Sequence, residues 1–301
     1  MKIAFWSEED GCGTTSGMAA IASVCAEAWN KRIILFQSGN QEGDLSRRLG
    51  TGKSKNNSEA FTQDSWEELC WLAKRGKLTK AVLLSYLVSS ARGRIYYLPQ
   101  GEYKKQDSYP KQDQIGIGTV LSFAEQMSGM AFIDCGSGKD QLSEYLLSQA
   151  DVVVVTISQE RQNLDAYFQR RHAFRGKVIY LVSPYYEESL YNRKNISRLY
   201  RIGEEELAVI PYHPVFRHMS ERGKIERFVR RQVRTAALEG QYDFPKELMH
   251  TAELVLRAAG GCVPRTYRAA GAQKKQRQPS GADARSCIRP PPYELKMLFV
   301  T

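Results

Sequence analysis

The sequence is poor in the features that mark several protein classes. No apolar run approaches the roughly 18 residues that cross a bilayer, and the longest mainly apolar one, Ala150–Ile157, is typical of a buried strand. The N-terminus has one Lys and a short apolar stretch before Glu8, Glu9 and Asp10. This pattern predicts a first strand that enters a loop, and it does not fit a secretory signal peptide.

Cysteine and histidine motifs are also missing. The six Cys (12, 25, 70, 135, 262 and 287) form no C-x-x-C pair, and the four His show no spacing typical of a metal site. Several Cys lie within apolar patterns, so we expect reduced thiols in a cytoplasmic protein. If the fold brings Cys12 and Cys135 together, two isolated buried thiols remain the simplest expectation. Nothing at motif spacing indicates a dedicated hydrolase, protease or oxidoreductase.

Positive charge is in excess but is concentrated near one end. The net charge is +10, and the 38 residues from Pro264 onward hold eight Lys or Arg and two Asp or Glu, which accounts for six of these charges. Residues 262–301 also hold five of the eleven Pro and show no helical or strand period. We predict a domain over residues 1–261 and a basic, proline-rich, disordered tail over residues 262–301. A shifted reading frame is the other explanation of the tail.

The domain alternates short apolar runs with amphipathic stretches. This order predicts an α/β fold with a mostly parallel central sheet and helices on both faces. The predicted strands are Lys2–Trp6, Arg32–Phe36, Arg94–Leu98, Met130–Asp134, Asp151–Ile157, Lys177–Val182 and Glu206–Ile210. The predicted helices are Thr15–Trp29, Trp66–Lys74, Lys80–Ser90, Ile117–Met127, Lys139–Ser148, Arg161–Ala173, Glu187–Tyr200, Arg222–Thr235 and Lys246–Ala259.

A glycine loop follows the first predicted strand. Residues 7–17 read S-E-E-D-G-C-G-T-T-S-G and lead into an Ala-rich helical pattern. A strand, a glycine loop and a helix in this order direct backbone N–H groups at phosphate. Two interpretations stay open. The loop binds phosphate, or it is a glycine turn that only joins strand to helix, with Thr14, Thr15 or Ser16 as the helix N-cap.

At this loop the sequence resembles the P-loop ATPases of the ParA/MinD type. Those proteins carry K-G-G-x-G-K-[ST] after the first strand, whereas residues 9–16 read E-D-G-C-G-T-T-S. Gly11, Gly13 and Thr15 match the motif. The signature Lys is replaced by Glu9, and the Walker Lys is replaced by Thr14. The resemblance implies a vestigial phosphate site made of Gly11, Cys12, Gly13, Thr14, Thr15 and Ser16.

Later landmarks resemble the same family in order and spacing over about residues 1–235. The segment F-I-D-C-G-S-G at residues 132–138 is similar to the Walker B region and contains Asp134. The family's D-x-D strand end is replaced by Gln37 and Gly39. If Mg²⁺ is bound at all, the resemblance implies Thr15 and Asp134 as its ligands. Otherwise Asp134 is a strand-end residue that caps a turn.

The lost lysines have a large energetic consequence. A charge-assisted hydrogen bond contributes roughly 1.5–3 kcal/mol, so losing two removes about 3–6 kcal/mol, or two to four decades of affinity. Glu8, Glu9 and Asp10 add like charge beside the triphosphate position. Hydrolysis also needs charge stabilisation and an oriented water, which the missing acidic pair would support. We therefore expect no catalytic residues and no cofactor, or only weakly bound ATP or ADP with Mg²⁺.

Two further segments each admit two interpretations. Glu226–Arg234 places Phe228, Val229 and Val233 on one side and several Arg on the other. This is a core-facing helix with a solvated basic face, or an interfacial helix that contacts a membrane as in MinD relatives. Trp66–Leu84 holds eight large apolar residues. It is two helices packed on the sheet, or part of the surface that the family uses for dimerisation and partners.

Among ParA/MinD-type proteins, the sequence is most similar to TadZ/CpaE-like members. That resemblance implies a cytoplasmic, homodimeric pseudo-ATPase that acts as a scaffold or localisation factor for pilus or secretion-system assembly at the inner face of the membrane. One alternative is an ATP-dependent dimerisation switch in which Lys53 or Lys55 replaces the missing lysines. A second alternative is a protein that binds DNA nonspecifically through Lys and Arg, as ParA relatives do.

Overall fold

A computed structural model describes most of the first 261 residues. The described residues are 1–38, 44–50, 65–90, 93–99, 111–139, 141–170, 172–235 and 243–261. The predicted tail over residues 262–301, including Cys262 and Cys287, lies outside them, and so do Gly39, Lys53 and Lys55. The domain boundary and the disorder of the tail therefore stay predictions.

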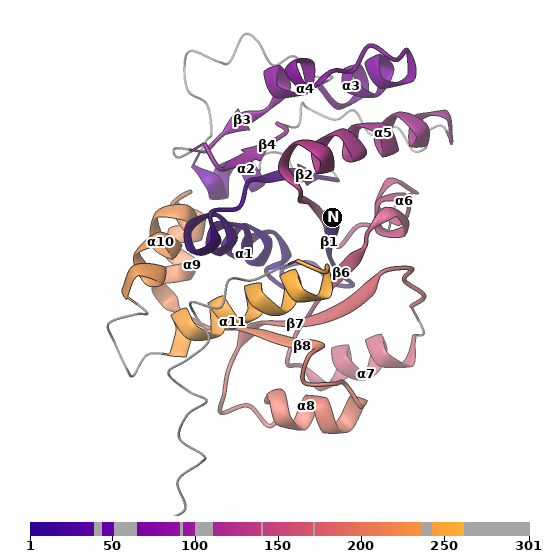
Figure 1. The fold of residues 1–301 in the computed structure, drawn as a ribbon. Helices are drawn as coiled ribbons and strands as arrows, with labels where there is room; N and C mark the ends of the chain where they lie inside the picture. The colour runs from indigo at the N-terminus through magenta and orange to yellow at the C-terminus, as the bar shows by residue number, and fades with distance from the viewer. Residues whose placement is uncertain are drawn as a thin grey trace, which may run out of the picture. The chain divides into compact units, whose positions relative to one another are not determined.

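Eight strands form one sheet in the order β3-β4-β2-β5-β1-β6-β7-β8 (Figure 1). All neighbouring pairs are parallel except β3 and β4. The strands are β1 (Lys2–Ser7), β2 (Ile33–Gln37), β3 (Val88–Ser89), β4 (Ile95–Tyr97), β5 (Ala131–Gly136), β6 (Val152–Ile157), β7 (Lys177–Tyr185) and β8 (Leu207–Pro211). The seven predicted strands are all present, and the predicted mostly parallel α/β sheet is confirmed.

Helices cover both faces of this sheet (Figure 1). One face is packed by α1 (Thr14–Trp29), α2 (Asp44–Leu49), α9 (Pro214–Glu221), α10 (Ile225–Thr235) and α11 (Asp243–Ala258). The other face is packed by α3 (Ser65–Lys74), α4 (Lys80–Tyr86), α5 (Lys111–Ser128), α6 (Gln141–Gln149), α7 (Arg161–Gln169) and α8 (Arg193–Tyr200). Because side chains of a strand alternate between faces, β1 contributes Phe5 to the first layer and Trp6 to the second.

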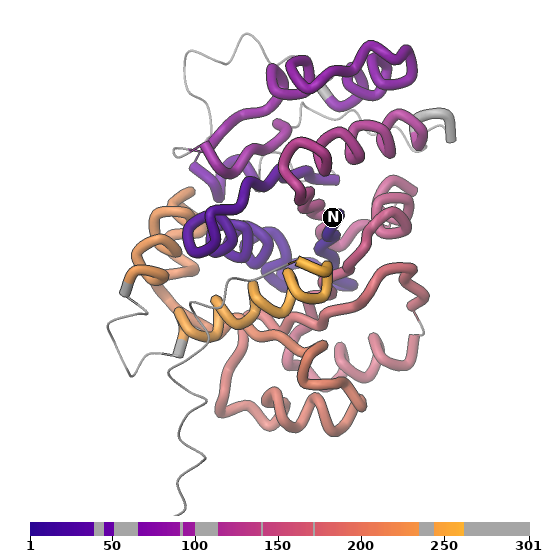
Figure 2. The backbone as a smooth tube through the Cα atoms, viewed as in Figure 1, coloured from indigo at the N-terminus to yellow at the C-terminus, as the bar shows by residue number. Residues whose placement is uncertain are grey.

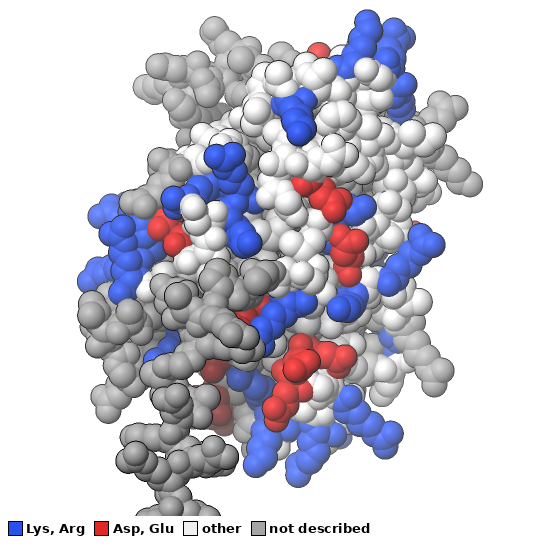
Figure 3. All heavy atoms as spheres, in the orientation of Figure 1, with Lys and Arg blue, Asp and Glu red and all other residues white. Residues whose placement is uncertain are grey.

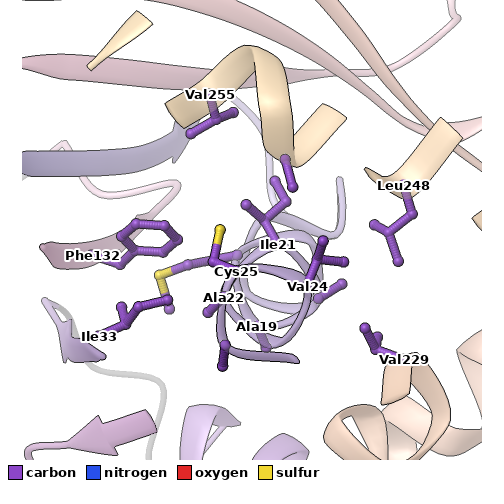
Figure 4. Close-up of a cluster of buried hydrophobic side chains, with 14 of the residues drawn as sticks. Ala19, Ile21, Ala22, Val24, Cys25, Ile33, Phe132, Val229, Leu248 and Val255 are labelled. Carbon is purple, nitrogen blue, oxygen red and sulfur yellow. The ribbon is translucent and has the colours of Figure 1, made fainter. Parts of the chain in front are cut away.

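The centre of the first layer is α1, which is buried along most of its length. The C-terminal helices α10 and α11 return to pack against it, so the chain's indigo and orange-yellow parts lie side by side in Figure 2. Figure 4 shows Val229 of α10 and Leu248 of α11 beside Val24 of α1.

The amphipathic segment Glu226–Arg234 therefore faces the core. Phe228, Val229 and Val233 are all buried, and Val229 is fully inaccessible to solvent. The expectation of a membrane-facing apolar stripe on this helix is wrong, because α1 already covers the stripe. Among the described residues no helix is both long and apolar enough to cross a bilayer.

The segment Trp66–Leu84 likewise forms two helices, α3 and α4, that pack with α5 over the sheet. Leu69 and Leu83 are fully buried, whereas Trp71 stays half-exposed with the Arg75 guanidinium 4.2 Å from its ring centre. The packed-helix interpretation accounts for most of these apolar residues. A role of this surface in partner binding stays a prediction.

Several predicted helix boundaries are wrong. The helix predicted over Glu187–Tyr200 begins only at Arg193, because Asn192 caps it by accepting the backbone N–H of Asn195. Gln159 holds the preceding residues in another conformation by donating to two of their carbonyl oxygens. The helix predicted to reach Ala173 ends at Gln169, and the one predicted to reach Ser90 ends at Tyr86 and gives way to β3. The separate helices α2 and α9 were not predicted.

Candidate functional site

The glycine loop joins β1 to α1 through two left-handed residues. Gly11 and Gly13 have φ angles of 78° and 79°, a conformation that side-chain-bearing residues rarely adopt. Helix α1 then begins at Thr14, and its first backbone bond runs from the N–H of Gly17 to the carbonyl of Gly13, 2.7 Å away. Both glycines are thus required by the turn itself, whether or not a ligand binds.

The prediction that Thr14, Thr15 or Ser16 is the N-cap is wrong. The cap residue is Gly13, which has no side chain that could bond to the helix N-terminus. The Ser16 hydroxyl instead donates backward to the Gly13 carbonyl, at 3.0 Å. Since the first N–H groups of a helix have no intrahelical acceptor, those of α1 remain available to an anion. One half of a phosphate site is therefore retained.

The side chain at the Walker Lys position cannot replace the lost charge. Thr14 is 5% exposed, and its buried hydroxyl has no hydrogen-bond partner within the described part of the chain. Thr15 beside it is also buried. A hydroxyl is a neutral group on a short side chain, so Thr14 supplies neither the reach nor the charge of the lysine ammonium.

The three acidic residues before the glycines are bound within the chain. Arg170, at the end of α7, pairs with Glu8, and the His172 Nε2 lies 3.7 Å from the same carboxylate. Asn163 of α7 donates to Glu9, and Ser137, just after β5, donates to Asp10. The side of the loop that carries the signature Lys in the ParA/MinD motif is thus a set of carboxylates tied to neighbouring elements.

The pKa values around the loop follow from this burial and negative charge. Desolvation, with Glu160 and Glu8 nearby, raises the pKa of the Glu9 carboxyl above its usual range. Burial raises the pKa of the Cys12 thiol to about 11, with Glu9, Glu160 and Asp10 acting in the same direction. Cys12 is therefore a protonated thiol at neutral pH. Cys12, Cys25, Cys70 and Cys135 are all buried and free of disulfides.

Asp134 lies within β5, which continues to Gly136, so the expectation that Asp134 ends this strand is wrong. Asp134 is 1% exposed, and its Oδ1 accepts the backbone N–H of Gly136 at 3.0 Å. Gln37, which replaces a family acid, pairs with Asp134 across the β2–β5 register. No group of three or more metal-binding His, Cys, Asp or Glu is found among the described residues. Magnesium binding by Thr15 and Asp134 stays a prediction.

A pocket of about 420 Å³ opens above the loop at the carboxyl edge of the sheet. All six predicted loop residues from Gly11 to Ser16 line it, whereas Asp134 is not among its lining residues. The opposite wall carries Arg48 of α2 and Arg217 of α9. The Arg48 guanidinium donates to the Ser220 hydroxyl at 2.6 Å, and Arg217 pairs with Glu221 at 3.4 Å.

Two tyrosines complete the mouth of this pocket. Tyr186 follows β7 and Tyr212 follows β8, and their rings stack with centres 5.2 Å apart. Both rings are over a third exposed, at 45% and 40%. The two tyrosines and the two arginines were not predicted from the sequence. Only their places directly after parallel strands, or in helices next to the loop, could have indicated them.

Comparison with known proteins supports the fold. No model of a known protein family matches the sequence, and no curated protein matches it. A ParA family ATPase from Chlorobium tepidum is similar in structure, with 14% identity, a TM-score of 0.60, and 84% of this chain and 97% of that chain covered. MinD from Pyrococcus horikoshii in complex with Mg-ADP is also similar, with 16% identity, a TM-score of 0.59, and 86% of this chain and 97% of that chain covered. MinD from Aquifex aeolicus in a MinC:MinD complex has 14% identity and a TM-score of 0.60, with 87% of this chain and 97% of that chain covered.

These structures establish the architecture. The chain has the fold of ParA- and MinD-type ATPases, in agreement with the resemblance seen at the glycine loop. At such low identity the likeness concerns the fold alone, so the chemistry of this chain depends on its own residues.

Proposed function

We propose that this chain is a pseudo-ATPase, a scaffold or localisation factor with the ParA/MinD fold that acts without hydrolysing ATP. One observation supports this most directly. The loop that would hold triphosphate carries a buried Thr14 in place of the Walker Lys, and a carboxylate fixed by Asn163 in place of the signature Lys. Both positions that would neutralise phosphate are occupied by groups that do not.

The electrostatics oppose a triphosphate on the loop side of the pocket. Glu9 and Asp10 line the pocket there, and each faces phosphate oxygens of the same charge. Two arginines also line the pocket, but both already have partners. Arg48 donates to the Ser220 hydroxyl, and Arg217 pairs with Glu221. Two partly engaged guanidinium groups do not replace two lysines held at the loop, so tight binding and catalysis are both disfavoured.

Calorimetric titration of the full chain with ATP and ADP, with and without Mg²⁺, tests this proposal. We expect no binding heat up to millimolar nucleotide. Micromolar, Mg²⁺-dependent binding that Gly13→Val abolishes would overturn the proposal, because valine strains the left-handed turn of the loop. Ala at the exposed Trp71, far from the loop, is the matched control.

The pocket itself supports an alternative function. Free N–H groups at the start of α1, two arginines and a stacked tyrosine pair are suitable for an anion attached to a ring. An ATP-dependent dimerisation switch with an atypical site would use these groups. Mg-ATP-dependent dimerisation, lost in Arg217→Ala, would favour the switch over the scaffold.

Nonspecific DNA binding has a separate structural basis. Arg227, Arg231 and Arg234 are exposed on the outer side of α10, and Figure 3 shows Lys and Arg gathered over this helix. A DNA-binding protein would shift duplex DNA at low salt and release it steeply as salt rises. We propose that this basic face contributes to solubility and partner choice, and a salt-sensitive shift lost in Arg227→Ala/Arg231→Ala would reverse that view.

We also propose that the scaffold is a cytoplasmic homodimer that recruits components of a pilus or secretion apparatus at the inner face of the membrane. The proposal rests on the resemblance of the sequence to TadZ/CpaE-like proteins, some of which have degenerate nucleotide sites. MinD in the Aquifex aeolicus structure is bound to MinC, which shows that this fold engages protein partners. Cross-linking in cells should recover a pilus or secretion component, and recovery of division or partition proteins alone would contradict the assignment.

A further inference from the structure

A second pocket lies on the other side of the strand that leads into the loop. It has a volume of about 470 Å³ and is formed by the end of β1, the residues just before α6, the second half of α6 and the segment that follows α7. Most small-molecule sites have volumes of roughly 300–1,000 Å³. The pocket shares none of its lining residues with the glycine-loop pocket. It is a separate cavity that the proposed function does not use.

Aromatic rings form the inner wall of this pocket. Trp6, which is 5% exposed, lies with its ring centre 5.3 Å from His172 and 5.8 Å from Phe174. The His172 and Phe174 rings are nearly parallel, at 15°. The indole N–H of Trp6 already donates to the Gly138 carbonyl at 3.0 Å, so what Trp6 offers to a ligand is ring surface. A flat aromatic ligand matches such a wall by stacking or edge contact.

The charged residues at the rim favour a negative ligand. The lining includes three positively charged residues, Lys139, Arg170 and Arg175, and two negatively charged ones, Glu8 and Glu144. Arg170 and Glu8 pair with each other. Lys139 and Arg175 are exposed and form no ion pair with the described residues, which leaves one positive charge in excess after Glu144 is counted. That excess favours a single carboxylate or sulfonate over a polyanion.

We propose that this pocket is a binding site for a small, flat aromatic molecule that carries one negative charge. The ring packs against the aromatic wall to which Trp6, His172 and Phe174 contribute, and the anionic group lies toward Lys139 and Arg175. The site takes this ligand class through its own residues, independently of whether nucleotide binds at the glycine loop.

The position of the pocket gives the ligand access to the loop. Glu8 lines the pocket and is the first of the three acidic loop residues, and its carboxylate is held by Arg170 and His172. Trp6 and Ser7 are the last residues of β1 before that loop. A ligand against Trp6 therefore lies beside the Arg170–Glu8 ion pair that fixes one end of the loop. Binding in this pocket then changes the surroundings of the Glu8 carboxylate.

The test is calorimetric titration of the full chain with 2-naphthoate, an aromatic carboxylate, in parallel with neutral 2-naphthalenemethanol. We expect saturable 2-naphthoate binding at sub-millimolar Kd and several-fold weaker binding of the neutral probe. Arg175→Ala and Lys139→Ala should each weaken 2-naphthoate about fivefold, as expected for the loss of one exposed charge partner. Arg198→Ala on α8, also an exposed Arg, should leave the Kd unchanged.

Two further variants separate the pockets. Arg217→Ala, in the glycine-loop pocket, should not affect 2-naphthoate, whereas Trp6→Leu should weaken it strongly, provided that circular dichroism shows the variant folded. If Trp6→Leu does not fold, the two exposed cation variants still decide the question. Absence of saturable binding, equal affinity for both probes, or sensitivity to Arg217→Ala without sensitivity to Arg175→Ala would overturn the proposal.

Discussion

Two side chains, at positions 9 and 14, separate this loop from one that would clamp phosphate. The backbone around them is suitable: Gly11 and Gly13 adopt the left-handed turn, and the N-cap of α1 is a glycine without a capping side chain. What is missing is positive charge at Thr14 and Glu9. The proposed loss of affinity for nucleotide should therefore be reversible by restoring positive charge, without changing the fold.

Restoring the two lysines provides a residue-scale prediction. Thr14→Lys combined with Glu9→Lys should raise Mg-ATP affinity by roughly two to four decades over the native chain, since each charge-assisted contact contributes about 1.5–3 kcal/mol. Calorimetry measures the gain, and Thr14→Met with Glu9→Gln is the control of similar size without charge. If the doubly restored chain still shows no heat, the carboxylate-braced loop is closed to phosphate for a reason other than charge.

The Cys12 thiol provides a second residue-scale prediction. With a pKa of about 11, its thiolate fraction near pH 8.5 is roughly a hundredfold below that of an ordinary cysteine. Iodoacetamide should therefore modify Cys12 about two orders of magnitude more slowly in the native chain than in guanidinium chloride, as followed by peptide mass mapping. Cys25, which is fully buried, should be slower still. Native and denatured rates within a factor of a few would contradict the protonated, buried thiol.

At the scale of elements, helix α9 depends on a neutral histidine. The Nδ1 of His213 accepts the backbone N–H of Phe216 at 3.3 Å and thus caps the helix. The His213 ring packs against Phe228 and Phe244, with centres 5.4 and 4.8 Å away, and this desolvation lowers its pKa. Protonation would remove the acceptor that holds the cap.

This cap predicts a loss of stability in weak acid. Because the folded pKa of His213 is below that of the unfolded chain, its contribution is complete above about pH 6.5 and falls as the pH drops through that value toward the folded pKa. A lost cap costs about 1 kcal/mol. Urea unfolding measures the free energy of unfolding at pH 7.5 and at pH 5.5. Between these two pH values it should fall more for the native chain than for His213→Asn, because Asn caps the helix without titrating. An equal decrease for both chains would show that other groups determine the pH dependence of stability.

Helix α10 shows why an amphipathic pattern alone does not identify a membrane-binding element. Its apolar side consists of Phe228, Val229 and Val233, and the same three residues would serve a bilayer or a protein core. The choice is made by α1, which lies about 200 residues earlier in the sequence and packs against α10.

At the scale of the whole molecule, the proposed scaffold should assemble independently of nucleotide. Light scattering after size exclusion should give the mass of two 34.1-kDa chains both without nucleotide and with Mg-ATP, because the loop lacks the charge that would couple phosphate to dimerisation. The Thr14→Lys/Glu9→Lys variant is the useful comparison. A native chain that is monomeric alone and dimeric with Mg-ATP would identify a switch.

The sequence alone determined the architecture and the main candidate site. The seven predicted strands and the parallel α/β fold follow from short apolar runs that alternate with amphipathic stretches. Val152–Ile157 is such a run, and each of its residues is buried. The six loop residues that line the pocket are contiguous, so one glycine motif identified them together. The replacements at positions 9 and 14 are visible in the sequence without any structure.

The tertiary structure decided what depends on contacts between distant residues. Arg48, Arg217, Tyr186 and Tyr212 reach the loop from four separate segments, and no local pattern marks them. The same is true of the second pocket, where Trp6 meets His172 only because α7 ends early and the chain folds back over β1. Periodicity records which side of an element is buried, but the partner that buries it is chosen by packing across the whole chain.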